Sequence, residues 1–327
     1  SWKKTVVDHV KSDNFSAYHD SCQHAFEETL DWLSEWACSR NYGLGTNLPW
    51  DPQYVIESLS DSTIYMAYYT IVHLIQGGDL VGSTYEKPLN PEDFTEGVFD
   101  YVFLKKDYPA DCAIPEETLS KMRNEFEFWY PFDLRASAKD LIRNHLTMCL
   151  YNHASLWGAE KMPRSFFCNG YINVDGKKMS KSLGNFLTIQ DCLKTYGADA
   201  TRFAAADSGD TLGDANFEQS TANSAILKLY TFEQLVRETC DNISKFRQGH
   251  ADSRFGDRVF ANEMNRLVRE TENYYESVMF KAALKSSFFD LQLAQHHYRI
   301  AIGGDGYDMN AELLLRFFEI QTLMLTP

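Results

Sequence analysis

One basic, turn-rich stretch constrains this chain more than any other feature. It runs from Gly176 to Asn185 with the sequence GKKMSKSLGN, and we call it the lysine loop. Its glycines allow backbone conformations that other residues avoid, and its serines and asparagine favour turns because their side chains bond nearby backbone groups. Lys177, Lys178 and Lys181 repel one another unless an anion lies between them, and lysine binds phosphate as a mobile point charge. The stretch predicts a loop that binds a polyphosphate, although a solvated basic loop would have the same composition.

Length, charge and cysteine content limit the classes of protein that this sequence can encode. With 327 residues, 44% of them hydrophobic, the chain is long enough for two domains with a substantial core. A net charge of −15 excludes a protein that coats nucleic acid by bulk attraction, so any such contact has to be local. The seven cysteines form no Cys-x-x-Cys pair, so we expect reduced thiols, no metal site and a cytoplasmic protein. The longest apolar run, residues 64–75, is shorter than the ~20 residues that span a bilayer, so no membrane role is expected.

The first half of the chain alternates helical segments with turn-rich ones. Residues 1–35 have the apolar spacing of a helix, and the glycines, proline and aromatic side chains of 36–50 indicate a tight loop. Residues 58–63 can cap a following helix. The apolar spacing of that helix predicts one buried stripe, formed by Ile64, Tyr68, Ile71 and Ile75. Residues 79–130 contain scattered prolines and glycines and a helix that opens at Pro115, which is typical of an insertion.

Two predicted strands lead directly into candidate binding segments, the helix that contains Asp140 and the lysine loop. Residues 130–138 have strand character and run directly into a helix that contains Asp140 in its first turn. A strand, a tight turn and a helix in this order offer a helix N-terminus and an acid to a nucleotide. Residues 166–174 are predicted to form a strand that enters the lysine loop. Beyond the loop the pattern stays helical: Asn216 can cap a long helix, and residues 211–327 predict an all-α bundle.

Several motifs resemble one family of enzymes. Lys178–Ser182 matches, letter for letter, the Lys-Met-Ser-Lys-Ser loop of class I aminoacyl-tRNA synthetases. Trp36–Arg40 resembles the Trp-x-x-Ser-Arg segment at which the leucyl, isoleucyl and valyl enzymes re-enter the catalytic domain, and Gly43–Thr46 is similar to the eukaryotic cytosolic leucyl enzymes. Gly197–Arg202 is similar to the segment that follows the loop in many class I enzymes. The chain therefore resembles the leucyl-tRNA synthetases of the eukaryotic cytosolic type.

The resemblance implies an α/β fold class, with the second half of a class I Rossmann-type nucleotide-binding domain, an insertion, and an all-α bundle after it. Residues 1–50 would lead back from the editing domain, and 51–210 would form the catalytic half with its insertion at about 79–130 and the lysine loop at 176–185. Residues 211–327 would be a truncated bundle that binds the anticodon stem. The His-x-Gly-His signature of the class does not occur in the sequence. We therefore expect the first catalytic half and the editing domain to lie outside this segment.

The same resemblance implies two groups of site residues. The residues expected to bind ATP are Lys178, Met179, Ser180, Lys181, Ser182, Asp140, His145 and Gly170. The residues expected to bind leucine are Ser62, Tyr65 and His145. Ala138 stands where the leucyl family usually has glycine, so its methyl group would narrow the nucleotide pocket.

Each of these residues would have a distinct role. Lys178 and Lys181 would be the catalytic cations that stabilise the charge on the leaving pyrophosphate. Asp140 would accept hydrogen bonds from the ribose hydroxyls, and His145 would lie near the leucine carboxyl group or the adenylate. Gly170 would let the backbone approach the adenine.

The reaction implied is leucine–tRNA ligation, in which leucine and ATP form leucyl-adenylate and the acyl group passes to tRNA(Leu). ATP and Mg²⁺ would be required, and the chain would need the first half of the same enzyme as a partner. Two alternatives stay open. The segment could be a tRNA-binding or scaffolding module without catalysis, which the missing His-x-Gly-His element favours. It could also belong to a related class I enzyme for isoleucine, valine or methionine.

Overall fold

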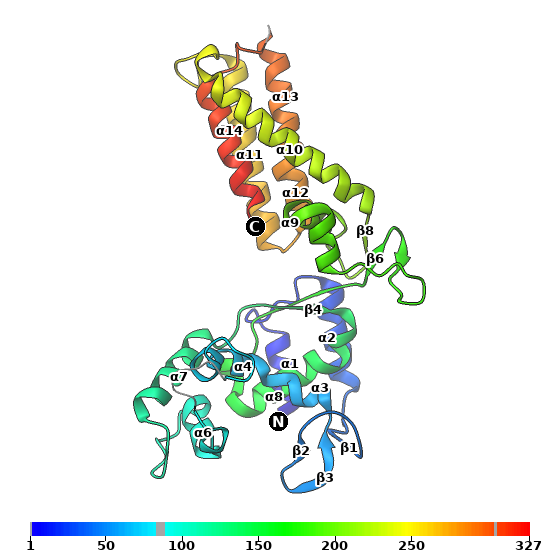
Figure 1. The fold of residues 1–327 in the computed structure, drawn as a ribbon, viewed down its shortest axis with the longest axis vertical. Helices are drawn as coiled ribbons and strands as arrows, with labels where there is room; N and C mark the ends of the chain where they lie inside the picture. Colours follow the sequence, from blue (N-terminus) through cyan, green and yellow to red (C-terminus); the bar gives the residue numbers. More distant parts are fainter. Residues whose placement is uncertain (1, 83–88, 304–305) are drawn as a thin grey trace. The chain divides into compact units, whose positions relative to one another are not determined.

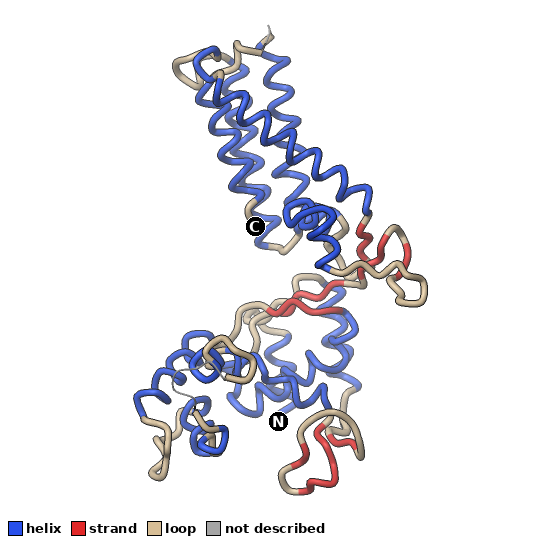
Figure 2. Tube along the Cα trace, in the orientation of Figure 1, coloured by secondary structure: helices blue, strands red, loops and turns tan. Residues whose placement is uncertain are grey.

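Helices make up most of the chain, and its strands are short (Figure 1, Figure 2). The computed structural model describes residues 2–82, 89–303 and 306–327. Positions 83–88 of the predicted insertion therefore lie outside the described residues. The prediction of a mixed α/β chain is confirmed.

The chain separates into two compact units, Ser1–Cys168 and Asn169–Pro327, and each is described by itself. The domain limits predicted after residues 50 and 210 follow the resemblance to a larger enzyme and stay predictions. Within the described residues, no helix is both long and apolar enough to cross a membrane.

Short helices and small sheets form the first unit. Its α-helices are α1 (Trp2–Val10), α2 (Asp20–Trp32), α3 (Ser58–Asp61), α4 (Tyr65–Tyr69), α5 (Val72–Gln76), α6 (Glu96–Leu104), α7 (Glu116–Trp129) and α8 (Thr147–Trp157). Its strands are β1 (Ser39–Arg40), β2 (Asn47–Leu48), β3 (Asp51–Ile56), β4 (Arg135–Ala138) and β5, which spans Phe166–Asn169. Strand β3 pairs antiparallel with both β1 and β2, and β4 pairs with β5.

Two groups of buried side chains hold the first unit together. In one of them, Phe26 of α2 stacks on Phe166 of β5 with ring centroids 5.7 Å apart, and both rings are fully buried. In the other, α6 and α7 pack together, and α7 buries Leu119 and Met122 on one side. The spacing of these two residues places them on one helix face, as the sequence after Pro115 predicts.

Longer helices and a three-stranded sheet form the described part of the second unit. The helices are α9 (Ile189–Asp207), α10 (Gln219–Asp241), α11 (Phe255–Glu276), α12 (Phe280–Leu284), α13 (Leu291–Ile302) and α14 (Ala311–Leu325). Strand β6 (Ile172–Val174) is central, antiparallel to β7 (Lys177–Lys178) and parallel to β8 (Ala215–Phe217).

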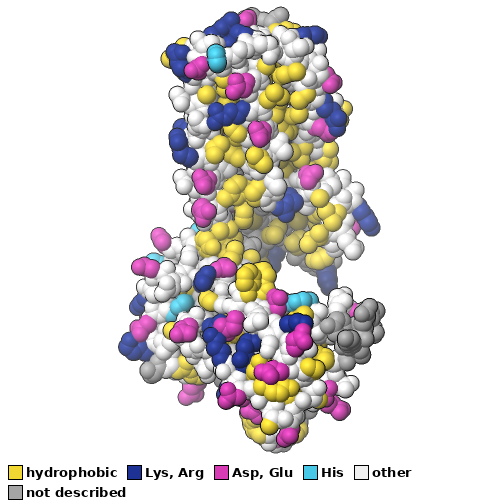
Figure 3. Space-filling model, turned by 90° about the vertical axis from the view of Figure 1, so that its left-hand side faces the viewer, with side chains coloured by type: hydrophobic (Ala, Val, Ile, Leu, Met, Phe, Trp, Pro, Cys, Tyr) yellow, Lys and Arg dark blue, Asp and Glu magenta, His cyan; other side chains and the backbone are white. Residues whose placement is uncertain are grey.

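Helices α11, α13 and α14 share a core that includes Phe260, Leu291 and Phe317. A separate cluster buries side chains of α9, of the start of α10 and of α12. Figure 3 shows that hydrophobic side chains also reach the surface of this unit, and Leu227 and Tyr230 of α10 are each more than half exposed. Helical periodicity alone therefore predicted the existence of these helices correctly, but it did not separate buried from exposed apolar positions.

The predicted helix over residues 64–75 is broken, and its single buried stripe is wrong. Ile71 is 1% exposed, whereas Ile64 and Tyr68 are 37% and 38% exposed. The backbone leaves helical geometry at Ile64 (φ −118°, ψ 8°), and at Ile71, between α4 and α5, φ is −116° instead of the helical value of about −63°. Each interruption rotates the next turn, so apolar side chains with helical spacing no longer share a face. The predicted end is confirmed, because Gly77 has a left-handed φ of 60°.

Two further expectations need correction around the lysine loop. The single strand predicted for residues 166–174 is two strands, β5 and β6, separated at Gly170 and Tyr171. Asn216 does not cap a helix but lies in β8, where its Oδ1 accepts a hydrogen bond from the Gly176 amide at 2.7 Å. Helix α10 begins at Gln219 instead.

Candidate functional site

The lysine loop begins as a β-hairpin. Asp175 and Gly176 connect β6 to β7, and both have left-handed backbone angles, with φ of 48° and 74°. Two consecutive residues of this kind form the hairpin turn whose twist matches that of the paired strands, and Asp-Gly is a favoured sequence for it. The turn places Lys177 and Lys178 on β7, opposite Val174 and Asn173.

The hairpin turn is bonded to the start of α10. The Asp175 carboxylate accepts one hydrogen bond from the backbone N–H of Gln219 at 3.0 Å and another from its side-chain Nε2 at 2.7 Å. These bonds, the side-chain one first, lower the pKa of Asp175. Asp175 is the one acid between Lys161 and Asn185. Because neutral donors hold its carboxylate, the charge of the neighbouring lysines is left to attract other anions.

Beyond the hairpin, the lysine loop folds on itself around Asn185. The Oδ1 atom of Asn185 accepts a hydrogen bond from the Ser180 amide at 2.8 Å, and its Nδ2 donates to the Lys178 carbonyl at 3.1 Å. We call these two bonds the Asn185 clasp. The hydroxyls of Ser180 and Ser182 lie 2.7 Å apart, and the Gly184 amide donates to the Lys181 carbonyl at 3.3 Å.

The lysines of the loop are available to an anion. Lys178 and Lys181 are exposed, and neither forms an ion pair with an acid of the described residues. The ammonium group of Lys178 lies 4.5 Å from the centre of the Tyr171 ring, a cation–π contact of modest strength at an exposed site. Three residues after the loop, the hydroxyl and amide of Thr188 form a capping box with Asp191 at the start of α9.

In the first unit, the residues that are predicted to bind leucine come together around His145. The Oγ atom of Ser62 lies 2.9 Å from Nε2 of His145, and the ring of Tyr65 stacks on the imidazole at 6.3 Å with 24° between the planes. His145 is 3% exposed, and its Nδ1 has no hydrogen-bond partner among the residues that the structure describes. Burial, followed by the positive charge of Arg135, lowers the pKa of His145 from its ordinary value of 6.5. The ring is therefore neutral at pH 7, with one buried polar atom left for a ligand.

An irregular helical turn presents Asp140 and His145. Residues Lys139–Leu141 form a 3₁₀ turn and Ile142–Leu146 a π turn, and α8 follows directly. Such π turns are rare and occur frequently at functional sites. Asp140 is exposed, and its carbonyl accepts a hydrogen bond from the Asn144 side chain at 3.1 Å.

Gly170 is required by a close approach of backbone within the chain. A Cβ atom at this position would lie 2.3 Å from the Gly213 carbonyl oxygen and 2.7 Å from that of Leu212. The predicted contact of Gly170 with adenine stays a prediction, because this close approach already explains the glycine.

The predicted site residues thus occur in two groups, one in each unit. Ser62, Tyr65, Asp140 and His145 belong to the first unit, whereas Gly170 and Lys178–Ser182 belong to the second. Sequence analysis missed three residues that shape these groups, Asp175, Gln219 and Arg135, and it identified Asn185 only as a residue that favours turns. The Asp-Gly pair was a readable hairpin signal, but nothing local to the sequence marks the bonds that Gln219 forms.

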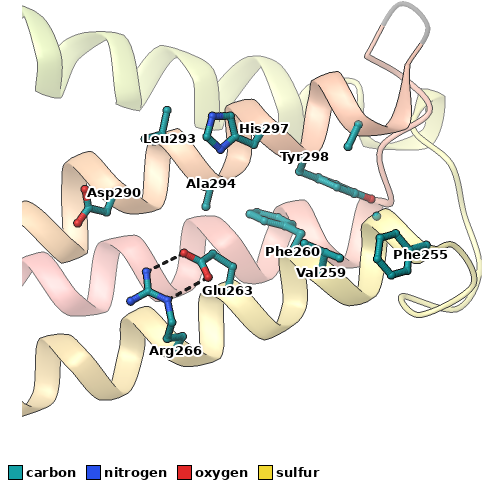
Figure 4. A pocket seen from close by; sticks show the side chains of 12 residues that line it. Phe255, Val259, Phe260, Glu263, Arg266, Asp290, Leu293, Ala294, His297 and Tyr298 are labelled. Atoms are coloured by element: carbon teal, nitrogen blue, oxygen red, sulfur yellow. Dashed lines mark hydrogen bonds and ion pairs between the residues drawn. The ribbon is translucent and has the colours of Figure 1, made fainter.

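A groove in the second unit is lined by none of these residues. It has a volume of about 520 Å³ between α11 and α13, and Phe260 and Tyr298 are among its lining residues (Figure 4). Glu263 and Arg266 at its side pair with each other at 2.7 Å. A smaller cavity of about 310 Å³ adjoins the lysine loop and is lined by both Lys177 and Asn185. Across the described residues, no cluster of histidines, cysteines or acids could hold a metal ion.

Comparisons of sequence relate the chain to known synthetases. The sequence model of a family described as "tRNA synthetases class I (C) catalytic domain" matches residues 118–225. The chain is 46% identical over 330 residues to the cytoplasmic leucine–tRNA ligase of Dictyostelium discoideum, covering 100% of this chain and 30% of that protein. It is 48% identical over 332 residues to the cytoplasmic leucine–tRNA ligase of Pongo abelii, covering 100% of this chain and 28% of that protein. The chain thus spans less than a third of these relatives.

Comparisons of structure agree on the fold. The methionyl-tRNA synthetase of Mycobacterium tuberculosis bound by methionyl-adenylate matches with a TM-score of 0.68 and 15% identity, over 100% of this chain and 58% of that one. The ternary complex of Agrobacterium radiobacter K84 LeuRS with tRNA and LeuAMS matches with a TM-score of 0.54 and 15% identity, over 90% of this chain and 34% of that one. At such identities the likeness concerns the fold alone. The chain thus shares a fold with the methionyl- and leucyl-tRNA synthetases, and its sequence is similar to a segment of the cytoplasmic leucine–tRNA ligases.

Proposed function

We propose that the chain is part of a leucine–tRNA ligase of the cytoplasm, which activates leucine with ATP and transfers it to tRNA(Leu). The observation that carries this proposal is the lysine loop, whose exposed Lys178 and Lys181 form no ion pair with a described acid while the neighbouring Asp175 is held by Gln219. The choice of leucine rests on identities of 46% and 48% to leucine–tRNA ligases over the whole chain.

The finer architecture is part of the same proposal. Residues 51–210 would contribute the second half of a Rossmann-type catalytic domain, with an insertion at about 79–130. Residues 1–50 would connect it to the editing domain. The long helices of residues 211–327 would contact the tRNA stem, in line with their location after the catalytic motifs.

In the mechanism that we propose, the lysine loop acts on the phosphates. The leucine carboxylate attacks the α-phosphorus of ATP, and negative charge builds up on the pyrophosphate that leaves. Lys178 and Lys181 stabilise that charge, while Met179, Ser180 and Ser182 form the ATP-binding backbone and hydroxyl surface around them. Mg²⁺ would supply further charge neutralisation, and it fits this site because it is bound largely through substrate phosphates and water rather than by a protein cage.

The first unit would bind the rest of the substrates. Asp140, exposed in its 3₁₀ turn, can accept hydrogen bonds from ribose hydroxyls. Ser62, Tyr65 and neutral His145 form a surface of two hydroxyls and two stacked rings, and this mixture suits leucine. A neutral imidazole avoids placing a second cation beside Arg135.

Leucine-dependent exchange of pyrophosphate into ATP tests the proposal. The exchange is measured with the chain alone, with the chain plus the N-terminal half of the enzyme, and with the complete enzyme. Exchange that requires leucine and appears on reconstitution supports the proposal. No exchange in any of them, together with retained tRNA binding, would refute it in favour of a tRNA-binding module. Exchange driven by isoleucine, valine or methionine instead would identify a related synthetase.

A further inference from the structure

The Asn185 side chain connects two backbone positions on either side of Met179. Its Oδ1 accepts from the Ser180 amide at 2.8 Å, and its Nδ2 donates to the Lys178 carbonyl at 3.1 Å. The loop is exposed at Lys178 and Lys181, yet Asn185 itself is half-buried. Both functional ends of one planar amide are therefore used within the loop.

We propose that Asn185 is a positioning residue for the catalytic lysines. The clasp fixes the backbone of Lys178 and of Ser180 directly. It constrains Lys181 through Ser180, the residue that precedes it. It thereby sets the separation of the backbone positions from which the two ammonium groups extend before ATP arrives. The inference rests on the proposed function, because it concerns how the lysine loop acts on the phosphates of ATP.

The chemistry of the clasp requires an asparagine. A donor and an acceptor are needed on one side chain, and the side-chain amide supplies both. Aspartate keeps the acceptor for the Ser180 amide but has no donor for the Lys178 carbonyl at pH 7, and it adds a negative charge among the lysines. Alanine removes both bonds. Short polar side chains form such local bonds to backbone readily, which is why asparagine is common in turns.

The clasp is separate from the contacts that hold the loop to the rest of its unit. Asp175 binds Gln219 at one end of the loop, and Thr188 binds Asp191 at the other. Neither of these bonds involves Asn185. Loss of the clasp should therefore loosen the middle of the loop without unfolding the helices that follow it.

The first experiment tests whether the clasp forms, and it uses the 327-residue chain. Amide hydrogen exchange of Ser180 is measured by NMR in the wild type and in the Asn185→Ala and Asn185→Asp variants. We expect faster exchange in Asn185→Ala, and protection in Asn185→Asp that is closer to wild type, because the acceptor remains. Equal exchange rates in wild type and Asn185→Ala would overturn the proposal.

The second experiment tests the positioning role in the complete enzyme that contains this segment. We expect both variants to lower kcat of leucine-dependent ATP–pyrophosphate exchange by about 10- to 100-fold, the size of effect that small misplacements of catalytic groups produce, with the KM for leucine within about twofold. The matched control is Asn242→Ala, which removes a side-chain bond to the Glu238 carbonyl at the far end of α10 and should leave kcat unchanged.

The two experiments separate this inference from the proposed function. A kcat for Asn185→Ala within twofold of wild type, in an enzyme that exchanges normally, would overturn the positioning role alone. A wild-type enzyme without leucine-dependent exchange would refute the proposed function and with it the catalytic role of the clasp. An equal fall of kcat in the Asn242→Ala variant would also contradict the inference, since it would show a general effect of losing an asparagine side chain.

Discussion

Replacing Gly170 by alanine would place one methyl carbon too close to the backbone of Leu212 and Gly213, which is less free to move than a side chain. The new Cβ would lie 2.3 Å from the Gly213 oxygen, 2.6 Å from the Gly213 carbonyl carbon and 2.7 Å from the Leu212 oxygen. Atoms in contact normally lie about 3.5–4.0 Å apart, so one of the two segments has to move by roughly 1 Å. Tyr171 is bonded to both Asp214 and Ala215 at 3.1 and 2.8 Å, so the displacement strains those bonds as well.

The expected loss of stability follows from the size of this clash. Overpacking of this kind costs about 1–3 kcal/mol, and for a unit of this size each kcal/mol lowers the melting temperature by about 2–4 °C. We therefore expect Gly170→Ala to lower the melting temperature of the second unit by roughly 2–12 °C in scanning calorimetry. Hydrogen exchange at the Ala215 amide, which donates to the Tyr171 carbonyl, should accelerate in parallel.

A second glycine provides the matched control. In Gly256→Ala the added methyl would meet the terminal Cδ1 atom of Ile302 at 3.0 Å, and a flexible side chain can move aside. Alanine also favours the helix in which Gly256 lies, so its melting temperature should stay close to wild type. A Gly170→Ala variant that melts with wild type but binds ATP weakly would refute the backbone explanation and assign the glycine to the nucleotide.

Three further predictions concern single side chains. Lys181→Ala in the complete enzyme should slow adenylate formation by about 10²-fold with little change in leucine binding, and equal losses in both would count against its role. Asp257 is fully buried and pairs with Arg247 at 2.5 Å. Asp257→Ala should lower the free energy of unfolding in urea by about 3–5 kcal/mol, because the arginine loses its charged partner. Burial alone would raise the pKa of Asp257, but the hydrogen bonds to its carboxylate outweigh burial and lower the pKa from 3.8. The stability that Asp257 contributes is therefore present above pH 3.8 and is lost as the pH falls through the folded pKa. An unchanged midpoint of acid unfolding in Asp257→Asn would contradict this. Tyr171→Leu should tighten ATP binding by about two- to fivefold in equilibrium titration, because Lys178 no longer rests on the ring, and weaker binding would show that the ring assists the nucleotide.

The sequence predicted the longer elements better than the short ones. The helices of the second unit carry apolar side chains at helical spacing over many turns, so their existence could be predicted. Residues 64–75 have the same spacing, but two backbone interruptions at Ile64 and Ile71 break the helix. No residue there is a glycine or a proline, so no helix-breaking residue in the sequence marks these interruptions. The break at Gly170 reflects the backbone of Gly213, which is 43 positions away (213 − 170).

The residues of the candidate site could be proposed from the sequence, but their geometry could not. The identities of Lys178, Lys181, Ser62 and His145 came from resemblance to a family, and the bond between Ser62 and His145 joins positions that no local pattern connects. The unpartnered Nδ1 of His145 is a property of the folded site and not of any motif. Roles in substrate binding remain predictions until ligands are measured.

The hairpin turn and the capping box also limit how far the lysines can travel. Asp175 is bonded to the first residue of α10, so the loop is tethered at a fixed point. A fully extended chain covers at most about 3.3–3.6 Å per residue, so the Cα atom of Lys181 can lie no more than roughly 20 Å from that of Asp175. Any anion that Lys181 binds must therefore come to the neighbourhood of α10. Insertions between Gly176 and Lys181 would lengthen this radius, and deletions would shorten it.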